Sequence, residues 1–263
     1  MYSLERKAEI INLIETKGHV SVAELSELFH TSKETIRRDI RELEQEHALA
    51  RTHGGAVALQ PTLDADSLLS TELPVSVRGI RNYQAKNDIC KKAASYIQSG
   101  DTVFVDNSST TIYLAQYIPA DIQVTFITNS LKFLIEASNL QRINQTYICL
   151  GGIFRGSNLS VYGNSTLNNA RGYYPNKVFL SCAGITSERM LTDASIQEVD
   201  TKKVMMELSK EVFVLADHTK FVKNGQVSLS HIDGVNHIIT DTTPPEESIQ
   251  FLQNHNIDLV ISN

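Results

Sequence analysis

The sequence predicts a two-domain α/β protein, with a small helical domain followed by a larger domain built on a mostly parallel sheet. Up to about residue 47 apolar residues recur every three or four positions, whereas from about residue 100 short apolar runs alternate with helical patterns. The chain has 263 residues, 41% of them apolar and 21% charged, which suits a globular protein of two domains. We expect domains at residues 1–58 and 77–263, joined by a polar linker with two prolines at residues 59–76.

The first domain is predicted to contain the three helices of a helix-turn-helix. A helix over residues 4–16 precedes two more, which we expect to begin at capping boxes formed by Ser21 with Glu24 and by Thr31 with Glu34. A tight break at residues 30 and 31 separates the last two helices. Their inward-facing residues are expected to be Val22, Leu25, Leu28 and Phe29 in one helix, and Ile36, Ile40 and Leu43 in the other.

The third helix has a basic face opposite an apolar one. At about 100° per residue, Arg37 and Arg41 lie about 40° and 80° around the helix from Lys33, and Arg38 lies about 140° away. Asp39 is expected to point away from this basic face. A helix fits the major groove of DNA, where arginine can hydrogen-bond to guanine and basic side chains can neutralise phosphates. The alternative is a solvated helix face held by salt bridges, which is the usual role of such charges.

A β-hairpin is predicted directly after this helix. Residues 48–58 place a turn at Gly54 and Gly55 between two short extended segments, with Arg51 and His53 on the hairpin. A hairpin beside a basic helix is typical of a winged helix-turn-helix, and it favours DNA binding over a merely solvated face. The net charge is −6, and residues 1–60 hold 8 Lys and Arg against 10 Asp and Glu, so any DNA site must be a local stripe.

The pattern S-x-x-T-I-R-R-D-I-x-x-L-E over residues 32–44, followed by R-x-H-G-G-A from residue 51, resembles the DeoR family of bacterial transcriptional regulators. The resemblance runs from about residue 4 to about residue 240 and implies a winged helix-turn-helix joined to a sugar-phosphate-sensing domain. One departure is His47, where many members have glycine at the end of the recognition helix. The residues expected to bind DNA are Ser32, Lys33, Thr35, Arg37, Arg38, Arg41, Arg51 and His53.

Seven short apolar runs of the second domain are predicted as strands that alternate with five helices. Each run alone is also compatible with a buried helix, but the alternation indicates βαβ units with a parallel sheet covered on both faces. The expected strands are residues 102–105, 124–128, 146–150, 177–182, 212–216, 237–240 and 257–261, and the expected helices are near residues 83–98, 109–118, 130–138, 197–209 and 247–254.

Polar residues follow several of these strands. The segment D-N-S-S-T-T at residues 106–111 links a strand to a helix, and such loops of parallel sheets bind ligands at a helix N-terminus that attracts anions. For this segment alone, a helix cap without a ligand is the alternative. Residues 128–130, 151–152, 183–184 and 217–220 follow other strands and are expected at the same rim. Lys202, Lys203 and Lys220 are candidates to offset the charge of a phosphate.

The second domain resembles the sensor domain of the same family, whose fold is shared with ribose-5-phosphate isomerases and CoA transferases. The resemblance is carried by F-V-D-x-x-S-T-T from residue 104, T-N-S from 128, L-G-G from 150, A-G-I from 183 and L-A-D-x-x-K-F from 215. It implies a phosphate loop at residues 107–111, in which Ser108 replaces a glycine common in the family. The residues expected to bind the effector are Asp106, Asn107, Ser108, Ser109, Thr110, Thr111, Thr128, Asn129, Ser130, Gly151, Gly152, Glu198, Lys202, Asp217 and Lys220.

These patterns predict a DNA-binding transcriptional regulator, a repressor of a carbohydrate-utilisation operon that responds to a phosphorylated sugar. Two recognition helices must read two half-sites, so we expect a homo-oligomer, either a dimer or a tetramer. The alternative is an isomerase-like enzyme carrying a DNA-binding domain, with Asp106 as base and Lys202 stabilising an enediolate. An enzyme that consumed its own signal would not serve a sensor, so we expect no catalytic activity.

We expect neither a cofactor nor a metal ion, because the eight histidines lack metal-ligand spacing. Cys90, Cys149 and Cys182 are expected to be small buried hydrophobic residues in a reducing compartment. No apolar run approaches the roughly 18 residues that span a bilayer, and the first residues lack the apolar stretch of a secretory signal. We therefore expect a soluble cytoplasmic protein with no membrane partner.

Overall fold

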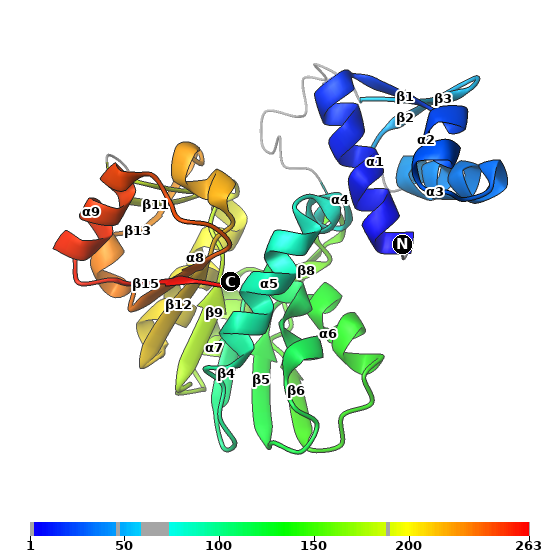
Figure 1. Ribbon diagram of the computed structural model, residues 1–263. Coiled ribbons are helices and arrows are strands. Elements are labelled where there is room, and N and C mark those ends of the chain that lie inside the picture. The colour runs from blue at the N-terminus through cyan, green and yellow to red at the C-terminus, as the bar shows by residue number, and fades with distance from the viewer. Residues whose placement is uncertain (1–2, 46–47, 59–73, 188–189, 263) are drawn as a thin grey trace. The chain divides into compact units, whose positions relative to one another are not determined.

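The computed structural model describes residues 3–45, 48–58, 74–187 and 190–262, and the chain divides into two compact units, residues 1–84 and 85–263 (Figure 1). The predicted fold class is confirmed, since a winged helix-turn-helix precedes an α/β unit with a large parallel sheet. His47 and most of the expected linker lie outside the described residues. Within those residues, no helix has both the length and the apolar character needed to cross a membrane.

The first unit contains the three expected helices, α1 (Ser3–Lys17), α2 (Val22–Leu28) and α3 (Lys33–Gln45). An antiparallel sheet in the order β1-β3-β2 adds the wing, and its strand β1, which the sequence did not predict, pairs with β3. A short helix, α4, begins at Val75, so its first two residues overlap the end of the expected linker. The bounds of these elements are His19–Ser21 for β1, Ala50–Thr52 for β2, Gly55–Val57 for β3 and Val75–Ile80 for α4.

The recognition helix α3 begins one residue later than its predicted capping box. Ser32, and not Thr31, caps the helix, because the Ser32 hydroxyl accepts a hydrogen bond from the Thr35 amide at 3.1 Å. Thr31 is held by α2 instead, where the Ser26 hydroxyl donates to the Thr31 carbonyl at 2.6 Å. His30 before it has a left-handed φ of 49°, which turns the chain between the two helices. Of the two adjacent hydroxyl residues, Ser32 therefore forms the cap, and Thr31 belongs to the turn between the helices.

A buried ion pair fixes α3 against α1. Arg6 Nε lies 2.5 Å from one carboxylate oxygen of Asp39, and its Nη2 lies 3.2 Å from the other. Both residues are buried, and a two-point contact between planar groups restrains orientation as well as distance. Lys7 and Glu42 add a second ion pair at 2.7 Å between the same helices. Asp39 thus points away from the basic face as predicted, and the pair sets the rotation of α3 that turns this face outward.

Two residues that were expected in the core are exposed. Leu28 has 52% of its surface exposed because it is the last residue of α2, where the helical period that predicted its direction stops. Cys149 is also exposed, whereas Cys90 and Cys182 are buried as expected. Cys149 ends β6, the edge strand of the large sheet, and so it has a neighbouring strand on one side only.

Seven parallel strands form the sheet of the second unit, in the order β15-β14-β12-β9-β4-β5-β6. The seven expected strands are all present, within two residues of their predicted ends. The strand order reverses between β4 and β9, and ligands of such sheets bind at the carboxyl edge beside this reversal. The strands are β4 (Thr102–Val105), β5 (Val124–Thr128), β6 (Gln145–Cys149), β9 (Lys177–Leu180), β12 (Glu211–Leu215), β14 (His237–Thr240) and β15 (Asp258–Ile261).

Helices cover both faces of this sheet (Figure 1). Val103 and Val105 of β4 pack in one apolar cluster with α5, whereas Phe104 between them packs in the other with α8, as alternation along a strand requires. The first cluster also includes η2 and α6, and the second includes α7 and α9. The helices are α5 (Tyr83–Ala94), η2 (Thr111–Tyr117), α6 (Leu131–Ser138), α7 (Asn164–Ala170), α8 (Ile196–Leu208) and α9 (Glu246–Asn254).

Several short elements of the second unit were not predicted. They include the helix α7, a two-stranded hairpin, a three-stranded antiparallel sheet in the order β10-β11-β13, and three short 3₁₀ helices. Their strands have only three or four residues, which is too short to show a hydrophobic period. Their bounds are β7 (Ile153–Arg155), β8 (Ser160–Tyr162), β10 (Gly184–Thr186), β11 (Met190–Asp193), β13 (Val227–Ser230), η3 (Gly156–Asn158), η4 (His218–Val222) and η5 (Ile232–Gly234).

Replacing Asp39 by alanine is expected to lower the free energy of unfolding of the first unit by about 3 to 5 kcal/mol, because the buried Arg6 loses its carboxylate partner. Denaturant unfolding followed by circular dichroism measures this loss. Glu34→Ala is the control, because the pair between Glu34 and Arg37 is exposed and is worth less than about 1 kcal/mol. Equal effects of the two substitutions would show that the buried pair does not hold α3.

Candidate functional site

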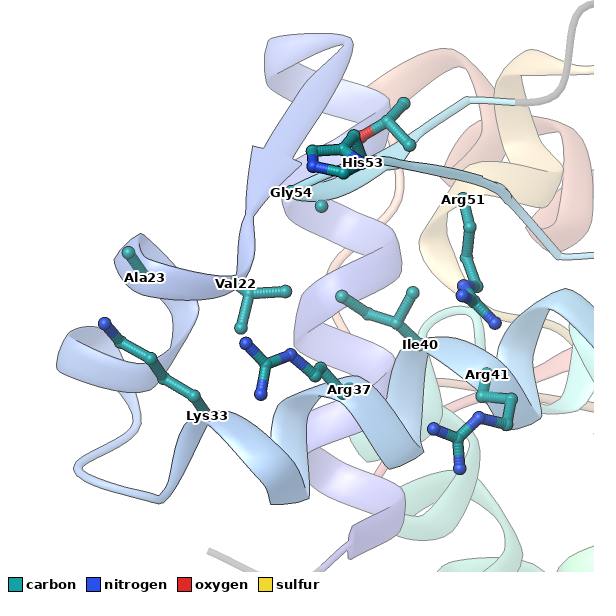
Figure 2. A pocket seen from close by; sticks show the side chains of 11 residues that line it. Val22, Ala23, Lys33, Arg37, Ile40, Arg41, Arg51, His53 and Gly54 are labelled. Atoms are coloured by element: carbon teal, nitrogen blue, oxygen red, sulfur yellow. The ribbon is translucent and has the colours of Figure 1, made fainter.

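A cleft of about 290 Å³ lies between the start of α2, the helix α3 and the turn of the wing (Figure 2). Lys33, Arg37 and Arg41 line it from α3, and Arg51 and His53 line it from the wing. Figure 2 shows the three α3 side chains along one side of that helix, with Arg51 extending toward it from the wing. Five of the eight residues expected to bind DNA therefore gather around one exposed cleft, on a chain whose net charge is −6.

The other three residues expected to bind DNA lie on α3 or at its start. Ser32 is exposed and caps the helix, and its hydroxyl lies 2.9 Å from that of the half-buried Thr35. Arg38 is exposed, does not line the cleft, and has its Nε 3.9 Å from Glu42. Ser32 thus has a structural task already, whereas Arg38 is placed for contact outside the cleft.

The basic side chains of the cleft are held only loosely by carboxylates. Arg37 lies 3.4 Å from Glu34, which is exposed and does not close the capping box that the sequence predicted. Arg51 lies 3.4 Å from Glu44. Such surface pairs contribute about 0 to 1 kcal/mol each, so phosphate oxygens can replace the carboxylates at little cost. For Lys33 and Arg41, the described residues include no carboxylate oxygen within 4.0 Å.

The wing turn is shifted by one residue from its predicted position. Thr52 pairs with Gly55 across the hairpin, so the two turn residues are His53 and Gly54, and Gly55 begins β3. Gly55 is required by close packing, because a Cβ there would lie 1.9 Å from the backbone oxygen of Val20 in β1. A Cβ on Gly54 would meet no atom within 4 Å. The glycine that the sequence assigned to the turn instead allows β1 and β3 to approach each other.

A buried charge cluster lies at the carboxyl edge of the second unit's sheet, where the strand order reverses. The Lys202 ammonium donates to Asp193 at 2.5 Å and to the Ser181 carbonyl at 2.9 Å, and lies 3.1 Å from Asp106. Burial alone would lower the pKa of Lys202, but the negative charges of Asp193, Asp106 and Glu198 have the larger effect and raise the pKa well above its ordinary value. Lys202 is therefore charged, and its ammonium is surrounded by Asp193, Asp106 and the Ser181 carbonyl.

The carboxylate oxygens of Asp106 are likewise occupied by partners within the protein. Its carboxylate accepts hydrogen bonds from the Ser108 amide at 3.1 Å, the Thr111 hydroxyl at 2.8 Å and the Ser181 amide at 3.1 Å, in addition to its contact with Lys202. A general base needs a free carboxylate oxygen that can take a proton from the substrate. The geometry assigns Asp106 to holding the loop after β4, and it does not favour the isomerase alternative.

The predicted phosphate loop, residues 107–111, is buried and rich in hydroxyls. The Ser108 hydroxyl accepts from the amide of Thr111, the first residue of η2, at 3.2 Å. Its φ is not positive, so a side chain fits where the family often has glycine. The Ser109 hydroxyl accepts from the Lys86 ammonium at 3.2 Å, and the Thr110 carbonyl accepts from Cys90. Asn107 differs from all of these, because its side-chain nitrogen and oxygen are both buried and neither has a hydrogen-bond partner.

The loop after β5 combines structural hydroxyls with a second unsatisfied amide. The Thr128 hydroxyl accepts from the Ser130 amide at 2.9 Å, and the Ser130 hydroxyl caps α6 by accepting from the Phe133 amide at 3.1 Å. Asn129 donates its Nδ2 to the Val161 carbonyl at 3.2 Å, but its side-chain oxygen is buried without a partner. Thr128 and Ser130 thus shape this loop, and Asn129 retains a free acceptor.

The glycine pair after β6 is explained by the backbone. Gly151 and Gly152 both have positive φ, 65° and 129°, in the region that favours glycine. A Cβ on Gly152 would lie 2.1 Å from the Thr166 hydroxyl oxygen. The pair lies two strands away from β4, so it is not directly joined to the charge cluster around Asp106.

Glu198 in the first turn of α8 is buried and is contacted by the β7–β8 hairpin. Its Oε1 accepts hydrogen bonds from Arg155 at 2.8 Å and from the Asn158 side-chain amide. Arg155 also donates to the Ser195 hydroxyl at 2.9 Å. Because the sequence did not predict this hairpin, it missed both Arg155 and Asn158. The structure brings Glu198 into the electrostatic range of Lys202, but its hydrogen bonds are to the hairpin.

Asp217 and Lys220 lie together after β12. Asp217 is buried, which raises its pKa, but Lys220, a hydrogen bond from Thr219 and the charge of Lys86 lower it below the ordinary value. The carboxylate accepts from the Thr219 amide at 3.0 Å and from its hydroxyl at 2.5 Å. Asp217 is thus ionised, and the charge of Lys86 links it to the loop after β4.

Lys86, Asp193 and Asp241, which follows β14, are buried charged residues of this edge that sequence reasoning missed. Lys86 shares one face of α5 with Ile89, Cys90 and Ala93, so a charge within an apolar helix stripe was the available signal. Asp193 ends β11, a strand too short to predict, and nothing in its local sequence marked it. Within the described residues, no group of three His, Cys, Asp or Glu side chains is placed to hold a metal ion.

The sequence matches two family models, the DeoR-like helix-turn-helix domain over residues 6–62 and the DeoR C terminal sensor domain over residues 81–242. The chain belongs to the DeoR family. It is therefore a DNA-binding transcriptional regulator, as the sequence predicted, and the regulators similar to it agree with the expectation that it is not an enzyme.

Three curated relatives are similar over nearly their full length. The uncharacterized HTH-type transcriptional regulator YulB of Bacillus subtilis (strain 168) is 35% identical, with 98% of this chain and 96% of the relative covered. The HTH-type transcriptional regulator IolR of the same organism is 31% identical, covering 97% and 98%. The glycerol-3-phosphate regulon repressor of Escherichia coli (strain K12) is 31% identical, covering 98% and 99%. A solved ribose 5-phosphate isomerase from Methanocaldococcus jannaschii is 16% identical, with a TM-score of 0.40, over 54% of this chain and 56% of that one.

Replacing Gly55 by alanine is expected to displace the wing, because the new Cβ meets backbone atoms of β1 that cannot move independently. Core overpacking of this kind costs about 1 to 3 kcal/mol or more. Gly54→Ala is the matched control in the same hairpin, and its Cβ meets open space. Thermal unfolding compares the two proteins. Equal melting temperatures would contradict the tight packing of Gly55 against Val20.

Proposed function

We propose that this regulator represses a carbohydrate-utilisation operon and leaves its operator when a phosphorylated sugar or sugar alcohol binds to the second unit. The main support is the pair of buried, unsatisfied asparagine side chains, Asn107 and Asn129, which follow adjacent parallel strands at the edge where such sheets bind ligands. The regulator from Escherichia coli, named as the repressor of a glycerol-3-phosphate regulon, supports both the direction of control and the class of effector.

The DNA step is assigned to the basic cleft. Arg37 and Arg41 lie on the side of α3 that faces the wing, and arginine forms paired hydrogen bonds to guanine in the major groove. Lys33 and Arg51 are placed at the margins of the cleft, where a backbone phosphate would lie, and Arg38 supplies a further phosphate contact outside it. Each of these side chains is exposed, so DNA binding requires little desolvation of buried charge.

The regulator is proposed to act as a homo-oligomer, a dimer or a tetramer. One α3 helix covers a single half-site, and helix-turn-helix proteins gain specificity by placing two such helices about 34 Å apart along the duplex. A two-fold symmetric operator then matches a two-fold symmetric protein. The effector acts by binding one arrangement of the subunits more tightly than the other, since only differential affinity shifts such an equilibrium.

The effector step is assigned to the loops after β4 and β5. A buried polar group without a partner costs about 1 to 3 kcal/mol, so three unsatisfied atoms on two side chains are a substantial penalty for an otherwise well-bonded edge. Hydroxyl groups of a sugar both donate and accept, which matches an amide nitrogen and an amide oxygen. The hydroxyls of Ser109 and Thr110 and the ammonium of Lys86 are the donors that a phosphate requires.

For the DNA step, Arg37→Ala is expected to cost about 1 to 3 kcal/mol on the preferred operator and to relax its sequence preference. Arg38→Ala is expected to weaken all sequences alike and to reduce the slope of log affinity against log salt by about 1. Fluorescence anisotropy at several salt concentrations measures both, on a duplex selected from a random library. Lys17→Ala, an exposed lysine at the end of α1, is the control and leaves binding unchanged. Wild-type affinity in the Arg37 variant would exclude this interface.

For the effector step, Asn107→Leu is expected to keep or raise the melting temperature of the free protein, because an apolar side chain removes an unsatisfied buried amide. A sugar phosphate at about 100 times its dissociation constant stabilises the wild type by about 2.7 kcal/mol, and this gain is expected to be lost in the variant. The matched control is Asn87→Leu. The Asn87 oxygen accepts from Gln116 and Tyr117, so that variant is destabilised yet still responds.

Thermal unfolding with phosphorylated trioses, pentoses and hexoses, and with inorganic phosphate, distinguishes these outcomes. An Asn107→Leu variant that is destabilised when free but fully responsive to ligand would place the effector elsewhere in the second unit.

A further inference from the structure

Helix α5 contains residues of both units. Tyr83 and Gln84 belong to the first unit, and the helix continues from Ala85 into the second. Tyr83 packs with Ile80 against the apolar core of the helix-turn-helix. Three residues later, Lys86 lies within the second unit and donates a hydrogen bond to Ser109 in the predicted phosphate loop. A single helical turn thus connects a residue of the DNA-binding core with a residue of the candidate effector site.

The burial of Lys86 requires an explanation. Only 4% of its surface is exposed, and its neighbours on the same helix face are apolar. A buried ammonium is costly unless charged or polar groups compensate for its lost hydration. Lys86 contacts the Ser109 hydroxyl at 3.2 Å, and its charge lowers the pKa of Asp217 after β12. A positive charge is therefore kept inside the protein beside two loops of the carboxyl edge.

The other lysines of this edge are less suited to contact an anion. Lys202 is enclosed by Asp193, Asp106 and the Ser181 carbonyl, and an effector phosphate would have to displace one of these partners. Lys220 is only half-buried and acts on Asp217 in its own loop. Lys86, by contrast, is buried and donates a hydrogen bond to Ser109 in the hydroxyl-rich loop itself. The same loop contains the unsatisfied side chain of Asn107, two residues before Ser109.

We propose that Lys86 contacts the anionic group of the effector and couples its binding to the DNA-binding unit through the first turn of α5. This inference rests on the proposed function of the loop after β4. An anion at Ser109 attracts the Lys86 ammonium and shifts the turn that carries it. Residues three apart lie on the same side of a helix, so the shift reaches Tyr83 and changes its packing against the helix-turn-helix core.

The experiment separates binding from response. Calorimetric titration of the full-length protein with glycerol 3-phosphate, fructose 6-phosphate and inorganic phosphate gives the affinity for each anion, and fluorescence anisotropy gives its effect on operator binding. Lys86→Gln is expected to weaken anion binding about 10- to 100-fold, the range for losing a charge-assisted hydrogen bond, and to leave operator binding without ligand unchanged. Lys91→Gln, an exposed lysine on the same helix, is the control and behaves as the wild type.

Tyr83→Ala tests the coupling. It is expected to bind the anion within about twofold of wild type but to remain on the operator when the anion is added, since coupling and binding are separate free energies. Operator binding without ligand, equal to wild type, verifies that the first unit is folded. If Tyr83→Ala fails this check, Tyr83→Leu is judged by the same criterion.

The outcomes distinguish this inference from the function on which it rests. If the wild type binds none of the three anions, the proposed effector site fails and the inference fails with it. If the wild type binds and Lys86→Gln binds equally well, the effector site stands and the role of Lys86 is overturned. A folded Tyr83 variant that leaves the operator as readily as the wild type overturns the coupling through α5.

Discussion

The parallel pairing of β4 with both β5 and β9 determines the chemistry of the second unit. It brings the residues that follow these strands to one edge, where Asp106 accepts a hydrogen bond from the Ser181 amide and both contact Lys202. Polar groups buried at such an edge must find partners, because each one left without a partner costs as much as several good packing contacts gain. The charges of this cluster meet that requirement among themselves, and they hold the loop after β4 in place.

The same requirement divides the polar residues of this edge into those with full hydrogen-bond partners and those without. Asp106, Ser108, Thr111 and Lys202 bond to one another or to the backbone, and an effector that used them would first have to break these contacts. Asn107 and Asn129 lie among them without full partners. Residues with identical sequence signatures, all polar and all at strand ends, thus divide into two groups only when their hydrogen bonds are examined.

In the first unit, a buried pair directs an exposed surface. Arg6 and Asp39 fix the rear of α3, so the basic residues on its other side project into the cleft instead of turning toward the core. This arrangement explains how a chain with an excess of acidic residues presents a local positive surface. Among the carboxylates of α3, Asp39 is buried against α1, Glu42 pairs with Lys7 of α1, and Glu34 is paired loosely at the surface.

The spacing of apolar residues predicted most of the fold, because it shows which side of a helix or strand is buried, and the large sheet and α3 each have such a buried side. The sequence failed where a distant contact decides between local alternatives. Gly54 and Gly55 both fit a hairpin turn, and the close packing of Gly55 against Val20 places Gly55 in β3 and leaves the turn to His53 and Gly54. The sequence also did not predict that Asp193, on a strand too short to predict, pairs with Lys202.

Lys86 escaped notice for the opposite reason. A charged residue within an apolar helix stripe is a visible signal, but the stripe itself predicts only packing, and no spacing rule connects residue 86 with a loop more than twenty residues away. Candidate site residues on the loops after β4, β5 and β12 were predictable as a group, since strand ends converge. Their individual tasks were not, because hydrogen-bond partners come from other elements.

The energies involved are of a size that a regulator can use. Satisfying one buried amide group returns about 1 to 3 kcal/mol, and an allosteric coupling of about 1 to 3 kcal/mol changes affinity by roughly 5- to 150-fold. An edge with all its polar groups hydrogen-bonded would be more stable, but a ligand binding there would recover no free energy from unsatisfied groups. The unsatisfied side chains of Asn107 and Asn129 therefore reduce the stability of the free protein by an amount that a ligand bonding to them would recover. Under the function proposed above, this gain shifts the protein toward the released form to the extent that it is larger there than in the operator-bound form.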